Sequence, residues 1–132
     1  MKTFVIKIRI NECFETTNGS QTAKIILFSG ECDNEYFKGH VLDGGVDTQI
    51  QSIGKRTTLS ARYILEGLDY RGNTCKIFIE NNGYIEEDGS IHTRPFIITD
   101  SSELKWLETQ MKSGYIEHKD NSIYVVLTDS IC

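Results

Sequence analysis

A carboxylate and an amide that directly follow a pair of glycines are the first residues in this chain that could do chemistry. Asp47 and Gln49 come after Gly44 and Gly45, and they are two residues apart. Because successive side chains of a strand point to opposite faces, both should project from one face. A carboxylate held there can act as a general acid or base. We therefore predict that Asp47 is catalytic if the protein is an enzyme, and that Gln49 binds ligand.

An arginine on a neighbouring apolar segment is the second candidate. Arg62 alternates with a face that is wholly apolar, formed by Leu59, Ala61, Tyr63 and Leu65. Two registers are open: the apolar face fills the interior and Arg62 is exposed, or the apolar face packs outward and Arg62 looks inward. An isolated strand favours the first, because a buried arginine needs a partner. In the second register Arg62 could hold an anionic group by paired hydrogen bonds, and it is the second residue that we predict to be catalytic if the protein is an enzyme.

Two further polar residues are candidates for the rim of a pocket. Asn82 precedes Gly83, and this pair reads either as turn chemistry or as an amide offered to a ligand. Arg94 stands immediately before Pro95, which lacks an amide donor, so the segment is expected at a strand end or a sheet edge. Asn82 and Arg94 are therefore predicted to be ligand-binding residues at a mouth.

Familiar catalytic and metal-binding patterns are missing from the sequence. There is no phosphate-binding loop, no nucleophile elbow, no zinc-protease motif and no dinucleotide fingerprint. The three histidines lie on separate segments and are interpreted as surface or strand residues. The cysteines are too far apart for a metal site and are predicted to be reduced thiols: Cys13, Cys32, Cys75 and Cys132. The sequence thus predicts no metal and no cofactor.

The charge and hydropathy patterns exclude two classes of partner. The formal net charge is −5 and the 14 Lys and Arg residues are scattered, which argues against nucleic-acid binding. No stretch approaches the roughly 20 apolar residues that a membrane helix needs. The first ten residues alternate in polarity instead of forming a secretory apolar run, so we expect a cytoplasmic protein without a membrane partner.

Strand signals dominate the chain. Alternating or apolar runs bounded by turn residues predict strands at residues 3–10, 23–28, 36–42, 46–52, 57–66, 73–81, 90–98, 115–118 and 122–128. The second and third of these are expected to pair as a hairpin. A capping pattern at residues 100–103, followed by Leu104, Leu107 and Met111, predicts one helix that ends at Gly114. The expected fold is all-β: one antiparallel barrel of about eight to nine strands over residues 1–132, with a short helix near the C-terminus.

Several segments resemble a known family when they are taken in order. They are residues 37–49, which contain the diglycine and Asp47; residues 59–63; residues 79–83; residues 93–96; and residues 104–107, which contain the single tryptophan. In this order the chain resembles uncharacterised protein family 0311, also called domain of unknown function 3237, and the likeness spans nearly the whole chain.

The resemblance implies an antiparallel β-barrel with no assigned reaction, in a family where homo-oligomers are common. It also places the family's polar motif positions at five residues that would meet near one mouth: Asp47, Gln49, Arg62, Asn82 and Arg94. Our hypothesis is a pocket for a small polar or anionic metabolite, with or without cofactor-free acid–base chemistry such as isomerisation or cyclisation. The alternatives are a binding barrel without chemistry and a structural oligomer.

Overall fold

The computed structural model describes residues 1–131, and Cys132, predicted above to be a terminal thiol, lies outside them. Within residues 1–131 the chain forms nine strands and two short helical segments. They are β1 (Thr3–Thr17), β2 (Gln21–Asp33), β3 (Phe37–Val41), β4 (Val46–Ser52), β5 (Thr57–Asp69), β6 (Thr74–Ile85), β7 (Ile91–Thr99), η1 (Ser102–Leu104), α1 (Trp106–Gln110), β8 (Ser113–Lys119) and β9 (Ser122–Thr128). None of the helical segments described is long and apolar enough to cross a membrane.

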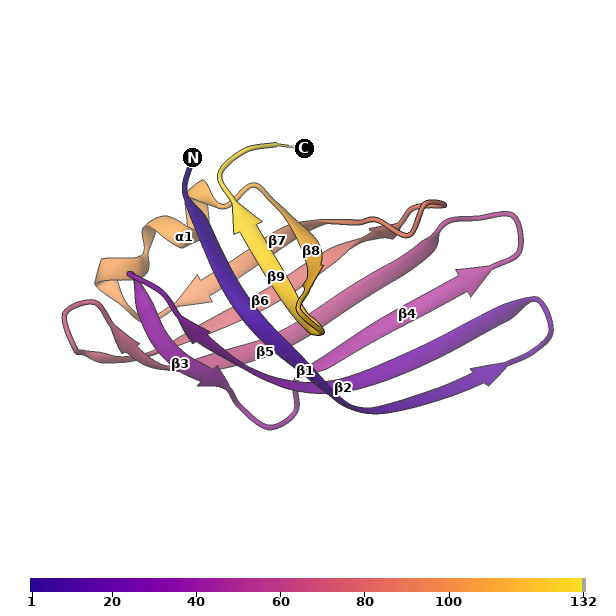
Figure 1. Cartoon of the computed structure of the whole chain (residues 1–132), viewed down its shortest axis with the longest axis horizontal. Helices are drawn as coiled ribbons and strands as arrows, with labels where there is room; N and C mark the ends of the chain where they lie inside the picture. Colours follow the sequence, from indigo (N-terminus) through magenta and orange to yellow (C-terminus); the bar gives the residue numbers. More distant parts are fainter. Residues whose placement is uncertain (132) are drawn as a thin grey trace.

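The strands form one antiparallel sheet that closes on itself (Figure 1). The order is β1-β9-β8-β7-β6-β5-β3-β2-β4, and additional pairings of β1 with β2 and of β5 with β4 complete the ring. β3 and β4 share one place in it, because both lie between β2 and β5: β4 pairs with residues 58–62 of β5 and β3 with residues 65–69. The prediction of an all-β barrel with one short helix is confirmed.

The first hairpin is longer than the sequence predicts. β1 continues to Thr17 through an irregularity between Ile10 and Glu12, and it pairs with β2 along most of its length. The predicted hairpin of residues 23–28 with 36–42 is present with other bounds: β2 and β3 pair at residues 31–33 and 38–40, and residues 21–27 of β2 pair with β4 instead. The sequence pattern predicts the end of the strand at Ile10 and a turn around residues 16–20; the turn lies there, between Thr17 and Gln21, but a bulge carries the strand on to it.

The interior is filled at one end by side chains from every part of the ring. Fully buried positions include Phe4, Ile6, Phe37, Leu65, Ile77, Ile79, Leu104, Leu107 and Leu127. β5 adopts the first of the two registers considered above, in which the apolar face fills the interior: Tyr63 and Leu65 are buried, and Ile64 is 38% exposed. The apolar face of β5 therefore points inward.

The helical segment covers the side of β7 that lacks a strand partner. β7 pairs with β8 only at His92 and Thr93, and the rest of that edge faces α1. The Ser101 side chain caps η1 by accepting a hydrogen bond from the Leu104 amide at 3.2 Å. The helix ends at Gln110 and not at Gly114, which instead lies inside β8. The predicted helix is therefore present but shorter.

Candidate functional site

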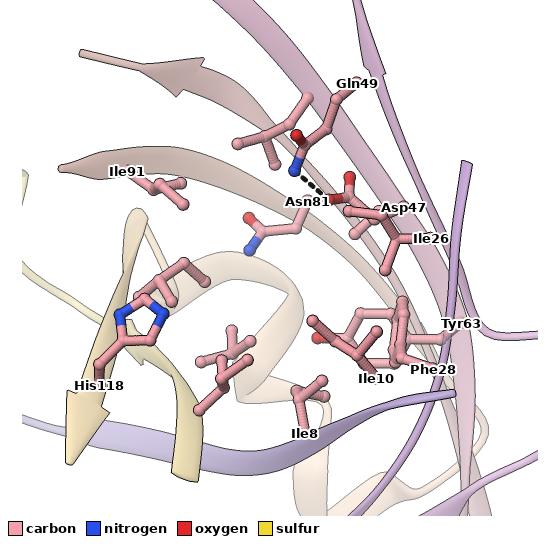
Figure 2. A pocket seen from close by; sticks show the side chains of 15 residues that line it. Ile8, Ile10, Ile26, Phe28, Asp47, Gln49, Tyr63, Asn81, Ile91 and His118 are labelled. Carbon is pink, nitrogen blue, oxygen red and sulfur yellow. Dashed lines mark hydrogen bonds between the residues drawn. The ribbon is translucent and has the colours of Figure 1, made fainter. Parts of the chain in front are cut away.

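A cavity of about 220 Å³ lies inside the barrel at the end away from the helix (Figure 2). Most of its wall is apolar and comes from β1, β2, β5, β8 and β9, with side chains such as Ile8, Ile26, Phe28, Leu59, Ile116 and Val125. Its polar groups are few. Cavities of this kind, mostly apolar with a small number of placed polar groups, are the usual form of a small-molecule site.

Asp47 and Gln49 lie on the inner face of β4, as their spacing predicts. The chain enters β4 from the diglycine, where Gly44 has a φ of +106° that favours glycine. In the register with β5, Asp47 is opposite Ala61 and Gln49 is opposite Leu59, so both polar side chains join the apolar inner face. Gln49 Nε2 donates a hydrogen bond of 2.9 Å to Asp47 Oδ2. Both residues line the cavity.

The Asp47 carboxyl group is held in surroundings that disfavour its charge. Burial raises the pKa of Asp47 above its ordinary value, and the hydrogen bond from Gln49 and the backbone of Ser60 offset this only in part. The other oxygen, Oδ1, is buried and has no hydrogen-bond partner among the described residues. An unpartnered carboxylate oxygen on an apolar wall is costly unless something else satisfies it.

Two more buried oxygen atoms without partners line the same cavity. They are Tyr63 Oη and Asn81 Oδ1, on residues that are only 4% and 3% exposed. Asn81 is opposite Ala61 in the β5–β6 register, which puts it two strands across from Asp47 in one row. Burial raises the pKa of Tyr63, with a smaller contribution from Cys32, so its hydroxyl stays protonated. Asp47, Tyr63 and Asn81 thus present unsatisfied polar atoms to one space.

The sequence reasoning missed Tyr63 and Asn81. Tyr63 was assigned to an apolar face, and Asn81 was predicted at the end of a strand without being counted among the site residues, yet each alternates with buried aliphatic residues of its strand. A polar group at a core-facing position was the signal available in the sequence. Gly83 was also taken as a turn residue, but it lies inside β6, where a Cβ would come within 2.0 Å of the His92 carbonyl oxygen. Glycine there permits close strand approach.

Arg62, Asn82 and Arg94 lie on the outer face of the barrel, so the predicted meeting of all five polar residues at one mouth is wrong. Arg62 Nε lies 2.8 Å from Glu80 Oε2 and its side chain is 56% exposed. Asn82 Nδ2 donates to Glu80 Oε1 at 2.9 Å, and Arg94, opposite Asn82, is exposed. The pleat explains the split, because these positions have the opposite parity to Ala61 and Asn81.

A histidine stands at the rim of the cavity, opposite the carboxylate. His118 on β8 is exposed and lines the opening, across from Asp47 and Gln49 (Figure 2). Within residues 1–131, no three His, Cys, Asp or Glu side chains gather closely enough to hold a metal ion. The chemistry available at the cavity wall is therefore that of a carboxyl group, amides, a phenol and one imidazole.

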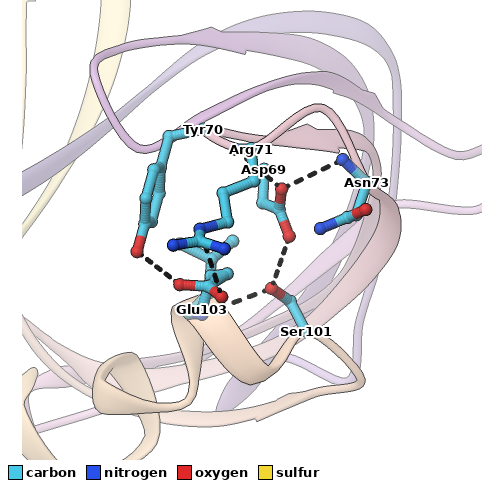
Figure 3. Close-up of polar contacts among 7 residues, drawn as sticks. Asp69, Tyr70, Arg71, Asn73, Ser101 and Glu103 are labelled. Atoms are coloured by element: carbon cyan, nitrogen blue, oxygen red, sulfur yellow. Dashed lines mark hydrogen bonds and ion pairs between the residues drawn. The ribbon is translucent and has the colours of Figure 1, made fainter.

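A second polar cluster, at the helix end of the barrel, is satisfied internally (Figure 3). Asp69 Oδ1 accepts hydrogen bonds from the backbone amides of Arg71 and Asn73, at 3.0 and 3.1 Å. Asp69 Oδ2 accepts one from the Ser101 hydroxyl at 3.0 Å. Glu103 accepts a hydrogen bond from the Tyr70 hydroxyl and pairs with Arg71. These contacts tie the β5–β6 turn to η1, and the cluster is structural.

Asp69→Asn is expected to lower the midpoint of thermal unfolding by several degrees. Burial alone would raise the pKa of Asp69, but hydrogen bonds from Asn73, Ser101 and Arg71 outweigh it and lower the pKa. The carboxylate therefore adds stability above its ordinary value of 3.8, and this is lost as pH falls through the folded-state pKa. Thermal melts at neutral pH measure the change. Asp33→Asn, where the side chain is 78% exposed, is the control and should melt like the wild type; equal melting of all three proteins would show that the cluster is not structural.

Comparison with known proteins places the chain among proteins of unknown function. A curated relative, a UPF0311 protein of Clostridium acetobutylicum, is 35% identical over 100 residues; the match covers 63% of this chain and 61% of the relative's length. A crystal structure of a protein with unknown function from the same organism has a TM-score of 0.78 at 23% identity, over 96% of this chain and 93% of that one.

Two further solved structures have the same fold. A conserved protein of unknown function from Rhodopseudomonas palustris has a TM-score of 0.73 at 22% identity, over 96% of both chains. A beta-barrel-like protein from Acinetobacter baumannii has a TM-score of 0.69 at 19% identity, over 96% of this chain and 93% of that one. The family model for DUF3237, described as a protein of unknown function, matches residues 2–94. The chain therefore belongs to the DUF3237 family.

Proposed function

We propose that the barrel binds a small, mostly apolar and uncharged molecule that carries hydrogen-bond donors. The observation that supports this is the set of buried oxygen atoms without partners around one apolar cavity, on Asp47, Tyr63 and Asn81. A buried polar group left unsatisfied costs about 1–3 kcal/mol, and a ligand that supplies the missing donors removes that cost. The cavity therefore presents polar atoms whose hydrogen bonds a bound ligand would satisfy.

The hydrogen-bonding capacity of the three groups determines which chemical groups of a ligand they can bind. The free oxygens of Asp47 and Asn81 are hydrogen-bond acceptors, and the Tyr63 hydroxyl can donate or accept. A ligand hydroxyl or N–H group directed at the row formed by Asp47 and Asn81 therefore meets two acceptors. The rest of the molecule contacts aliphatic side chains and gains from burial of apolar surface.

An anionic ligand, our hypothesis from the sequence, is not favoured by this geometry. The arginines that would have held the anion lie on the outer face. Of the side chains that line the cavity, His118 at the rim is the one that could carry a positive charge. An anion in the interior would sit beside Asp47 without a buried cation, which is costly in a medium of low polarity.

The volume limits the ligand to about the size of one ring. An engineered apolar cavity of about 150 Å³ binds benzene. The cavity here, of about 220 Å³, has room for a benzene-sized ring with one or two substituents. Substituted phenols and comparable cyclic alcohols or lactams have this size and carry the required donor.

Calorimetric titration of the wild-type protein with three probes of matched shape tests the proposal. The probes are 4-methylphenol, which has a donor; toluene, which has none; and 4-methylbenzoate, an anion. We expect 4-methylphenol to bind about tenfold more tightly than toluene, which corresponds to one hydrogen bond to a buried partnerless group. We expect 4-methylbenzoate to bind most weakly. Equal affinities, or a preference for the anion, would contradict the proposal.

Acid–base catalysis at Asp47 is a second candidate, favoured by the raised pKa of this carboxyl in an apolar space. The carboxylate would take a proton from a carbon next to a carbonyl group and return one. Incubation of 4-methylacetophenone with the protein in deuterium oxide, followed by NMR, measures this exchange. Deuteration that is fast with the wild type and lost in Asp47→Asn supports catalysis. Equal rates for the two proteins would contradict catalysis at Asp47 and leave ligand binding as the only proposed function.

A further inference from the structure

An apolar patch covers the outer face of β5, β6 and β7. In the register of these strands, Ile64, Phe78 and Ile98 form one row across the sheet, and Phe96 lies in the next row. Ile64, Ile98 and Phe96 are 38%, 53% and 55% exposed, and the ring of Phe96 packs edge-on against Phe78. Contiguous exposed apolar side chains on a soluble domain commonly mark an interaction surface. This face does not border the interior cavity, since its residues have outward parity.

Charged residues flank the apolar row on both sides in an ordered pattern. On β5, Arg62 and Glu66 lie one outward position before and after Ile64; on β6, Glu80 and Lys76 lie on the two sides of Phe78. Within the chain the charges pair across strands, Arg62 with Glu80 and Lys76 with Glu66. On β5 and β6, opposite charges therefore lie at equal distances from the apolar centre, whereas on β7 the two positions beside Ile98 are Phe96 and Asp100.

We infer that this face packs against the same face of a second copy of the chain, about a two-fold axis that runs across the strands along the Ile64–Phe78–Ile98 row. Such an axis reverses the strand direction. It brings Arg62 opposite Glu66 of the partner subunit and Glu80 opposite Lys76 of the partner subunit, so every charge of the pattern meets its opposite. The apolar row meets itself at the centre, and the charges form a polar rim.

Two-fold axes that run along the strands fit this face less well. An axis between β5 and β6 would pair Arg62 with Glu80 of the partner subunit and Glu66 with Lys76 of the partner subunit, but it would move Ile98 on β7 away from the apolar row of the partner. A two-fold axis along β6 would place Glu80 opposite Glu80 of the partner subunit and Lys76 opposite Lys76 of the partner subunit. Like charges in direct opposition are repulsive. A pattern that complements itself under one two-fold operation is what a homodimer interface requires, whereas a different protein partner gives no reason for the symmetry about Phe78. The occupant is therefore a second copy.

Sedimentation velocity across a dilution series tests the interface, with the wild type expected to be a dimer that dissociates on dilution. Ile98→Lys places a charge on the proposed two-fold axis, opposite the same charge of the partner subunit, and should raise the dimer dissociation constant at least about thirtyfold, as for a buried hot spot. Ile53→Lys is the matched control, because Ile53 is 78% exposed in a turn away from this face. It should sediment like the wild type. A wild type that is monomeric throughout, or a dimer unchanged by Ile98→Lys, would overturn the inference.

Charge reversal gives a second test that does not depend on the apolar centre. Arg62→Glu should weaken the dimer about tenfold, because it opposes two glutamates across the interface, and the double variant Arg62→Glu with Glu66→Arg should recover most of this loss. Arg9→Glu is the control: it breaks a pair of similar exposure on β1 and β2, with side chains 54% and 52% exposed. Equal association of all four proteins, or failure of the double variant to recover, would contradict the proposed axis.

Discussion

Replacing Asp47 by Asn is expected to stabilise the unliganded protein by about 1–2 kcal/mol at pH values where Asp47 is charged, because it removes a charge that burial makes costly while the amide oxygen keeps the hydrogen bond from Gln49. Urea denaturation of the two proteins measures the difference. Asp33→Asn, at a side chain that is 78% exposed, controls for the loss of one negative charge and should leave the stability unchanged. A clear loss of stability in Asp47→Asn would show that the carboxylate serves the fold and not a ligand.

The pH dependence of this difference follows from the direction of the pKa shift. The pKa of Asp47 is raised above its ordinary value of 3.8, so between that value and the folded-state pKa the folded protein binds more protons than the unfolded one. Stability contributed by this group falls as pH rises through that window and stays lower above it. The advantage of Asp47→Asn over the wild type should therefore be greatest above the folded-state pKa and shrink as pH falls toward 3.8. An advantage that does not vary with pH would contradict the shift.

Filling the cavity should abolish binding without unfolding the barrel. Ile116 lies on the cavity wall on β8, partly buried, in a strand that pairs with β7 at only two positions and so can adjust. Ile116→Phe adds ring volume to the space, and we expect it to weaken 4-methylphenol binding at least tenfold, as measured by calorimetry. The free energy of unfolding should change by less than about 1.5 kcal/mol, as for tolerated hydrophobic exchanges.

The matched control places the same substitution outside the barrel. Ile25→Phe changes a residue that is 43% exposed on β2 and does not line the cavity. It should bind 4-methylphenol like the wild type. If Ile116→Phe also binds normally, the probe occupies another part of the surface and the interior cavity is not the site.

The alternation of side chains between the two faces of a strand explains which site residues the sequence placed correctly and which it placed on the wrong face. The spacing of Asp47 and Gln49 was enough to place them on one face, whereas the wholly apolar set opposite Arg62 favoured that face as core but left the register of the strand open. The resemblance identified Arg62, Asn82 and Arg94 as motif positions. A motif gives the order of residues along the chain, however, and does not say on which face of the sheet each side chain lies. Only the register between β4, β5 and β6 shows that Asp47 shares its face with Ala61 and Asn81.

The long first hairpin could not be predicted because a bulge hides it. The residues after Ile10 lose the alternation that identifies the start of β1, so the predicted strand ends at Ile10 although the turn was expected at residues 16–20, close to where it lies. Past the bulge the strand is held by its pairing with β2, and this pairing leaves no periodic pattern in the sequence of β1 itself. The same reason applies to β3 and β4, which both lie between β2 and β5. β2 and β5 each pair with β3 along one part and with β4 along another, and such a change of neighbour leaves no periodic pattern in the sequence.

The most direct test of the central claim is a crystal structure with 4-bromophenol, in which the bromine atom is located by its anomalous signal. We expect the ring within the cavity lined by Ile8, Phe28 and Val125, and its hydroxyl within hydrogen-bond distance of Asp47 Oδ1 or Asn81 Oδ1. Bromine found only on the outer surface, or a ring inside the cavity whose hydroxyl points away from both oxygens, would contradict the proposal that the barrel interior recognises a hydrogen-bond donor.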